Sequence, residues 1–160
     1  MKGRKARPAS GNFTSIDAIR HEHLGWLLER ADRLFARRVS HAVHTRGFDD
    51  VRLVHVRLIR SVEAGGTRIT DIARRTGMSK QATGQLVSEF TGLGYIRIVP
   101  DPNDGRIKIA EYTAKGKRLL AAIVEAITEA EDAVAASIGA ADLRTLKEML
   151  TRMIVSVEEE

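Results

Sequence analysis

The sequence contains no cysteine, and this one absence excludes several kinds of site. Without thiols there is no disulfide framework, no thiol redox switch, no thiolate metal site and no cysteine nucleophile. No stretch approaches the roughly 18 apolar residues that a membrane-spanning helix needs. The N-terminus also lacks the apolar core of a signal peptide. We therefore expect a cytoplasmic protein with no membrane partner and no cofactor.

Aromatic residues make up only 4% of the chain, but hydrophobic residues reach 43% and charged residues 29%. This balance is typical of a globular protein rather than a disordered one. A chain of 160 residues can bury a core without metal or disulfide staples. The composition predicts one ordinary domain, or one compact unit with helical extensions.

The net charge of +5 is unevenly distributed along the chain. Residues 1–66 carry 13 basic and 7 acidic side chains, residues 67–112 carry 7 and 5, and residues 113–160 carry 6 and 9. A basic front with an acidic tail suggests an anionic partner, of which nucleic acid is the commonest. Many basic proteins bind no polyanion, so charge alone does not identify the partner.

The two ends of the chain have simple patterns. Residues 1–14 are basic and contain glycine and proline, which predicts a flexible arm. Residues 15–47 have apolar side chains at helical spacing, and a second helical stripe runs through Val51, Val54, Leu58 and Val62. Residues 113–160 predict two further helices, separated near Gly139.

The middle of the chain predicts a helix, a turn, a second helix and a hairpin. Thr70 is the expected cap of a short helix at 71–76, and Gly77 permits a left-handed turn. Ser79 is the expected cap of a helix that runs to Leu93. The period then becomes strand-like at 95–99 and 106–110, on either side of a polar loop. This order is typical of a winged helix-turn-helix, so the predicted fold is mainly α with a small β-hairpin wing.

The outward face of the second helix is polar, which suits a major groove about 12 Å wide. Lysine reaches a phosphate or a guanine edge, and glutamine can make a bidentate contact with adenine. The expected inward positions are apolar: Ala82, Leu86, Val87 and Phe90. The candidate DNA-binding residues are Ser79, Lys80, Gln81, Thr83, Gly84, Gln85 and Ser88. The alternative is an ordinary solvated helix face.

Five stretches in order resemble the MarR (multiple antibiotic resistance regulator) family of dimeric bacterial transcription regulators. They are Ile72-Ala73 with Gly77-Met78-Ser79-Lys80-Gln81-Ala82, then Gln85-Leu86-Val87, Leu93-Gly94-Tyr95-Ile96, the loop Pro100-Asp101-Pro102-Asn103-Asp104-Gly105-Arg106, and Tyr112-Thr113-Ala114-Lys115-Gly116. The resemblance covers residues 69–120. The flanking helices match the family only in length and place.

The resemblance implies a homodimeric, sequence-specific transcriptional regulator: a repressor that binds palindromic double-stranded DNA and is released by a small ligand. It implies dimerisation helices at 15–47 and 113–160 around a DNA-binding region at 48–112. Arg106 would enter the minor groove, Asp104 would orient Arg106 or a neighbouring basic residue, and Lys108 completes the wing's DNA-binding candidates.

Three positions depart from the family pattern. Gly105 stands where a second basic residue is frequent, and this removes one charge from the wing. Thr83 stands at a commonly apolar position, so we expect it to face the groove or to bond its hydroxyl to the backbone one turn earlier. Gly84 lies inside a helix, where it costs about 1 kcal/mol relative to alanine. Its use would be close approach to DNA, or it is simply a tolerated weakness.

Members of the resembled family often bind aromatic acids near the dimer interface. By this analogy the candidate residues for a small aromatic ligand are Trp26, Arg30, His55 and Arg57. The alternative is that these side chains only pack. The five histidines do not predict a metal site, because two imidazoles such as His41 and His44 do not complete a tetrahedral set.

Two other classes of function compete with DNA binding. The modest charge of residues 67–112 permits a helical interaction module whose winged helix docks a protein partner. An enzyme is the more remote alternative, because the sequence contains no nucleophile elbow, phosphate-cradling glycine loop or paired carboxylate motif. We therefore expect a protein that is not an enzyme.

Overall fold

The computed structural model describes residues 23–158 of the chain. The chain divides into two compact units, residues 1–37 and residues 38–160, and each is described by itself. The predicted arm at 1–14 and the predicted helix start at Ser15 lie outside the described residues. Within the first unit, the described part is the beginning of α2.

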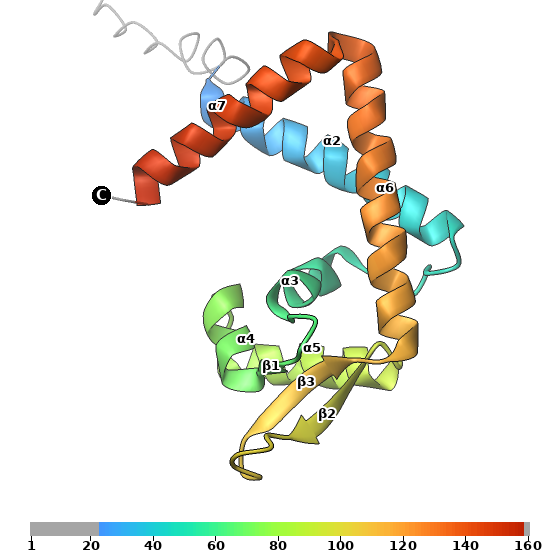
Figure 1. The fold of residues 1–160 in the computed structure, drawn as a ribbon, viewed down its shortest axis with the longest axis vertical. Coiled ribbons are helices and arrows are strands. Elements are labelled where there is room, and N and C mark those ends of the chain that lie inside the picture. Colours follow the sequence, from blue (N-terminus) through green and yellow to red (C-terminus); the bar gives the residue numbers. More distant parts are fainter. Residues whose placement is uncertain (1–22, 159–160) are drawn as a thin grey trace, which may run out of the picture. The chain divides into compact units, whose positions relative to one another are not determined.

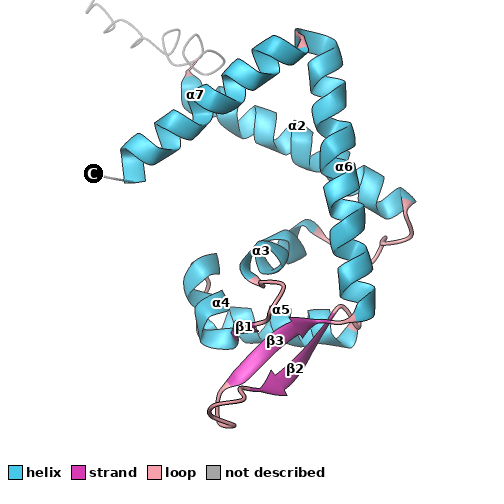
Figure 2. Cartoon of the chain, viewed as in Figure 1, coloured by secondary structure: helices cyan, strands magenta, loops and turns pink. Residues whose placement is uncertain are grey.

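The structure is mostly helical with one small sheet, which confirms the predicted fold class (Figures 1 and 2). Among the described residues, every helix is too short or too polar to cross a membrane. The elements in chain order are α2 (Leu24–Thr45), α3 (Leu53–Ser61), β1 (Thr67–Arg68), α4 (Ile69–Thr76), α5 (Lys80–Gly92), β2 (Ile96–Pro100), β3 (Lys108–Tyr112), α6 (Ala114–Ile138) and α7 (Ala140–Glu158).

The sheet has three antiparallel strands in the order β1-β3-β2. Ala110 at the centre of β3 pairs with Ile98 on one side and with Thr67 on the other. Side chains alternate between the two faces of a strand, and accordingly Ala110 and Tyr112 are buried while Glu111 between them is partly exposed. The sequence predicted the hairpin but not the pairing of β1 with it.

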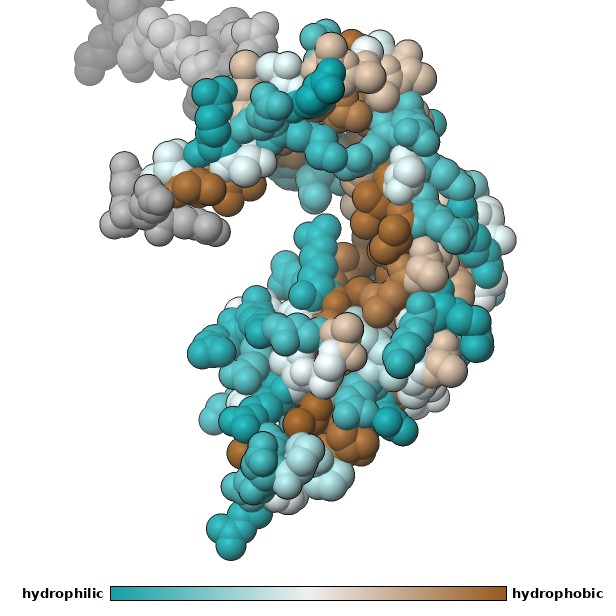
Figure 3. All heavy atoms as spheres, viewed as in Figure 1, coloured by the Kyte–Doolittle hydropathy of each residue, from teal (hydrophilic) through white to brown (hydrophobic). Residues whose placement is uncertain are grey.

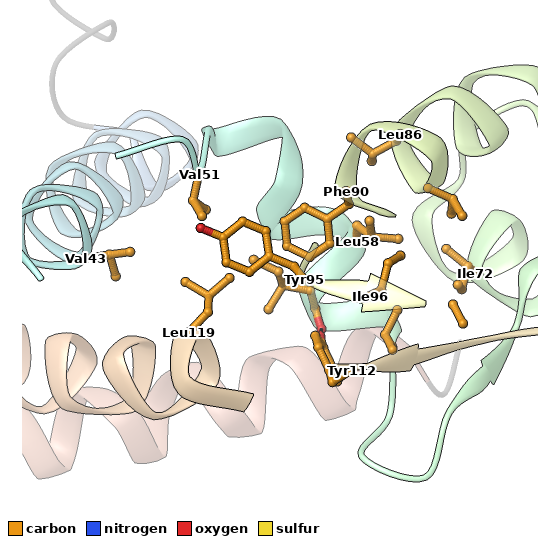
Figure 4. Packing of buried hydrophobic residues seen from close by; sticks show 14 of the residues in the cluster. Val43, Val51, Leu58, Ile72, Leu86, Phe90, Tyr95, Ile96, Tyr112 and Leu119 are labelled. Carbon is orange, nitrogen blue, oxygen red and sulfur yellow. Dashed lines mark hydrogen bonds between the residues drawn. The ribbon is translucent and has the colours of Figure 1, made fainter. Parts of the chain in front are cut away.

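A single cluster of buried side chains joins the helix-turn-helix to the start of α6 (Figure 4). Leu58 of α3, Ile72 of α4, Phe90 of α5 and Leu119 of α6 are all 0% exposed. The ring of Tyr95 stacks on that of Phe90 with 4.8 Å between centroids. Each large apolar side chain that is fully buried stabilises the fold by about 1.5–3 kcal/mol. This cluster therefore fixes α5 and the hairpin relative to α3 and α6.

Several predicted boundaries were wrong by a few residues. Thr70 is not a helix cap: α4 begins at Ile69 and its cap is Arg68, whose extended backbone belongs to β1. The second helix is shorter than its apolar stripe, because Val51 precedes α3 and Val62 is its C-cap. The strands of the hairpin are Ile96–Pro100 and Lys108–Tyr112. Both start later than predicted, and β3 does so because residues 101–107 form their own hydrogen-bonded loop.

Candidate nucleic-acid interface

The turn between α4 and α5 forms as the sequence predicted. Gly77 has φ 65°, in the left-handed region that glycine adopts without steric cost, and it ends α4. Ser79 caps α5, because its Oγ accepts a hydrogen bond from the Ala82 backbone N–H at 3.2 Å. The cap fixes where α5 starts and therefore which of its side chains face outward.

The outward face of α5 carries six of the seven residues predicted for it. Gln81, Gly84, Gln85 and Ser88 follow one another at steps of three and one, which places them on one stripe of a helix. The exposed members are Ser79, Lys80, Gln81, Gly84, Gln85 and Ser88. Leu86, Val87 and Phe90 lie on the buried side as expected, and Ala82 is half-buried. The exposed stripe is rich in hydrogen-bonding groups and has no bulky apolar side chain.

Thr83 is the member that the sequence placed wrongly. Its residue is 1% exposed, so it points into the core and not toward a groove. Its Oγ1 also has no hydrogen-bond partner among the described residues, so the expected bond to the backbone does not form. Position 83 precedes Leu86, Val87 and Phe90 by steps of three, four and seven, the spacing of their buried face. The polar character of threonine misled the prediction.

Most basic side chains of the winged-helix region are neutralised by nearby acids. Four of the seven between residues 67 and 112 form ion pairs: Arg68 with Asp101, Arg74 with Asp71, Arg75 with Glu63 and Arg97 with Glu111. In the described part of the chain no acid pairs with the other three, which are Lys80, Arg106 and Lys108. Within segment 67–112, the free positive charge is thus confined to the start of α5 and to the wing.

The wing is the hairpin of β2 and β3, and its tip is the loop of residues 101–107, here called the wing loop. Residues 102–106 are exposed, and hydrophilic side chains cover this end of the molecule (Figure 3). Asp104 Oδ1 accepts a hydrogen bond from the backbone N–H of Arg106 at 3.0 Å. No hydrogen bond or ion pair joins its carboxylate to the Arg106 guanidinium within the described region, so Asp104 shapes the loop backbone and does not hold the arginine side chain.

A bridge at the base of the wing was not foreseen from the sequence. Asp101 Oδ2 accepts hydrogen bonds from Nε and Nη2 of Arg68, at 3.1 and 2.8 Å. Its Oδ1 accepts the backbone N–H of Asn103 at 2.8 Å. The bond from Asn103, with that from Arg68, holds the pKa of Asp101 below its usual value against the opposing effect of burial. The partners are 33 residues apart, so local spacing gave no signal of this pair.

Of the four candidate ligand residues, His55 is contradicted by its position. It is 0% exposed, its ring lies 5.1 Å from that of Phe90, and its Nδ1 accepts the Arg52 backbone N–H at 3.1 Å. His55 therefore caps α3 inside the core and presents no surface to a ligand. Arg57 is exposed on α3. Within the first unit, the Arg30 guanidinium carbon lies 5.1 Å from the centre of the Trp26 ring.

The histidines do not form a metal centre in the part of the chain that is described. No group of three or more His, Asp or Glu side chains there is placed to hold an ion. His44 has a structural contact instead, since its Nε2 lies 2.9 Å from the Val51 carbonyl oxygen. This bond ties the end of α2 to the segment that leads into α3.

Comparison with known proteins finds one family whose sequence profile matches part of this chain. Residues 49–107, which include α3, β1, α4, α5, β2 and the wing loop, match the sequence profile of the MarR family. Over these residues the chain resembles the MarR family. None of the curated proteins matches the sequence.

Several solved structures share the fold at low sequence identity. CouR bound to a 23-mer DNA duplex superposes with a TM-score of 0.69 at 23% identity, over 85% of this chain and 95% of that one. RV1404 from Mycobacterium tuberculosis gives 0.68 at 19%, over 93% and 97%. CouR from Rhodococcus jostii RHA1 bound to p-coumaroyl-CoA gives 0.63 at 21%, over 82% and 92%. The helices that flank the MarR match therefore also follow this fold.

Proposed function

We propose that this protein is a sequence-specific DNA-binding transcriptional regulator, and that it acts as a homodimeric repressor released by a small ligand. The observation that carries the proposal is the place of its unpaired cations. Lys80, Arg106 and Lys108 are the basic residues of segment 67–112 without an acidic partner in the described region, and they lie at the start of α5 and on the wing. These are the two parts of a winged helix that contact a duplex.

In the proposed complex, α5 lies in the major groove. Gln81 and Gln85 are one turn apart on its exposed stripe and can each read an adenine edge by a bidentate contact. Lys80 binds a phosphate or a guanine edge, and the hydroxyls of Ser79 and Ser88 add short polar contacts. Because Gly84 has no side chain, the helix backbone can approach the bases closely between the two glutamines.

The wing lies in the adjacent minor groove. Arg106 reads the narrow groove and its negative potential, which favours A·T-rich steps rather than a unique base. Asp104 holds the loop backbone at Arg106, and Lys108 at the start of β3 binds a phosphate. Gly105 contributes no charge, so each wing carries two unpaired cations rather than three.

We propose that the terminal helices join two copies. Exposed apolar side chains are frequent on α6 and α7, and a monomer that left them in water would be prone to aggregate. These residues are Val124, Ile127, Ile138, Leu146, Met149, Ile154, Val155 and Val157. A two-fold dimer would present two α5 helices, which predicts a palindromic operator with half-sites about one helical turn apart.

A small aromatic ligand would release the repressor from DNA. Trp26, Arg30 and Arg57 remain the candidate residues, since an indole and guanidinium groups suit an aromatic acid. CouR, a structure of the same fold, is bound to p-coumaroyl-CoA. We expect a ligand of this chemistry to lower the affinity for the operator by stabilising a conformation that does not fit DNA.

Selection of bound duplexes from a random pool at physiological salt tests the proposal. We expect enrichment of a palindrome with two half-sites about one turn apart, bound by a dimer in ultracentrifugation. Recovery of unenriched duplexes, or of a single half-site bound by a monomer, would contradict the proposed recognition. A protein partner captured in place of DNA would favour the interaction module instead.

A further inference from the structure

The base of the wing is held by an ion pair whose carboxylate is nearly buried. The Asp101 side chain is 4% exposed, and that of Arg68 is 48% exposed. Both carboxylate oxygens are used, Oδ2 by two N–H groups of Arg68 and Oδ1 by the backbone N–H of Asn103. In addition, the backbone N–H of Asp101 donates to the Ile107 carbonyl at 2.9 Å, which closes the loop.

The two partners belong to different parts of the winged helix. Arg68 lies in β1 and is the N-cap residue of α4, the first helix of the helix-turn-helix. Asp101 directly follows β2 and begins the wing loop, drawn in pink between the two strands in Figure 2. The ion pair therefore ties the wing to the frame that also carries α5. A loop anchored at Asp101 presents Arg106, five residues later, in a restricted set of positions.

We propose that Arg68 is a positioning residue for DNA binding: by bonding Asp101, it fixes the wing loop so that Arg106 meets the minor groove. The inference rests on the proposed DNA-binding function and extends it to a residue outside α5 and the wing. The physical basis is preorganisation. A loop that is already ordered loses less conformational entropy when it binds, so its contacts contribute more of their energy to affinity.

A second ion pair in the same sheet provides a matched control. Arg97 bonds Glu111 through the same atoms, with Nε and Nη2 at 3.1 and 2.9 Å from Oε2. That pair joins β2 to β3 within their ladder, where Arg97 and Glu111 are register partners, and neither residue lies in the wing loop. Removing either bridge changes charge equally, but only the Arg68 bridge anchors the loop.

The decisive variant is Asp101→Asn, because a positioning role and a simple effect of charge predict opposite changes in DNA affinity. Loss of a negative charge should strengthen binding to DNA by general electrostatics. Loss of the anchor should weaken it. We expect Asp101→Asn and Arg68→Ala each to weaken binding to the selected operator about fivefold, whereas Glu111→Gln and Arg97→Ala change it by less than about twofold. Affinity is measured by fluorescence anisotropy, at a temperature where unfolding curves show every variant folded.

A double-mutant cycle with Arg106→Ala separates positioning from direct contact. If Arg68 acts through Arg106, replacing Arg68 has almost no further effect in a protein that already carries Arg106→Ala. In the free protein, NMR order parameters of the Asn103 and Ile107 amides should fall in Asp101→Asn and stay unchanged in Glu111→Gln. An undiminished effect of Arg68→Ala in the Arg106→Ala background would overturn the inference, as would stronger binding by Asp101→Asn. If the wild-type protein binds no duplex at all, the proposed function fails and this inference with it.

Discussion

The substitution Gly84→Ala should make the protein more stable and a weaker DNA binder. Gly84 is the fifth residue of the 13-residue helix α5, and a Cβ built there would meet nothing within 4 Å. Alanine can therefore replace it without a clash, and the gain in helix propensity is about 1 kcal/mol in the free energy of unfolding. For a chain of this size, that gain raises the melting temperature by about 2–4 °C.

The effect on DNA binding has the opposite sign because Gly84 lies in the middle of the exposed stripe. A methyl group between Gln81 and Gln85 would keep the helix backbone away from the groove that those side chains read. Overpacking of a closely fitted surface costs about 1–3 kcal/mol, so we expect at least about a fivefold loss of affinity. Calorimetric melting and anisotropy titration of the same preparation measure both quantities.

Gly92→Ala provides the comparison for this prediction. Gly92 ends α5, also has open space around its Cα, and lies about 12 Å further along the helix axis. We expect it to leave operator affinity unchanged. If Gly84→Ala is more stable and binds DNA as tightly as the wild type, the groove does not require a glycine there. If it is less stable, the reasoning from helix propensity is wrong.

Three further predictions concern the core, the wing and the response to acid. Thr83→Val should raise the unfolding free energy by about 1 kcal/mol, since it removes a buried unpaired hydroxyl; chemical denaturation should show no such gain for Thr91→Val, whose hydroxyl donates to the Val87 carbonyl. Arg106→Ala should reduce the salt dependence of operator binding by about one unit per subunit, and titrations at several salt concentrations that superpose on the wild type would remove Arg106 from the interface. The free energy of unfolding should fall as the pH drops below about 4. Urea unfolding should show a smaller loss in Asp101→Asn than in the wild type.

The expected loss of stability at low pH follows from the lowered pKa values of two carboxyl groups, Asp50 and Asp101. Burial alone would raise the pKa of Asp50, but hydrogen bonds from Tyr95 and Lys115 bring it below the ordinary value of 3.8. The pKa of Asp101 is also lowered. A carboxyl with a lowered pKa in the folded state stabilises the fold above its unfolded pKa and loses that contribution as the pH falls through the folded value. The loss is therefore expected on the acid side, and an unfolding free energy independent of pH between about 5 and 2 would contradict it.

The sequence predicted the elements of the DNA-binding region because their signals are local. Gly77 and Ser79 lie next to the turn and the helix start that they determine, and both are confirmed. The cap of α4 could not be predicted in this way. Residues 67 and 68 are drawn into the sheet by pairing with β3, some 40 residues later, and this tertiary contact overrides the favourable capping chemistry of Thr70.

The two buried polar candidates, Thr83 and His55, were proposed on different grounds. Thr83 was expected to be exposed because a polar residue in an amphipathic pattern usually is, whereas His55 was a candidate by analogy with the resembled family, with packing as the alternative. Each instead occupies a core position set by neighbours on other elements: His55 lies against Phe90, and Thr83 shares the buried face of Leu86 and Phe90. Their burial depends on how α3 and α5 pack together, which no single-helix pattern contains.

The charge of the winged helix illustrates how structure changes the meaning of composition. Seven basic against five acidic residues in segment 67–112 is weak support for a DNA-binding surface. In the folded chain, however, the arginines at 68, 74, 75 and 97 each face a carboxylate. What remains unpaired is concentrated at α5 and the wing. An unpaired cation releases counterions when it binds DNA, whereas a paired cation first has to break an internal contact. The affinity for DNA should therefore depend on Lys80, Arg106 and Lys108 far more than on the more numerous paired arginines.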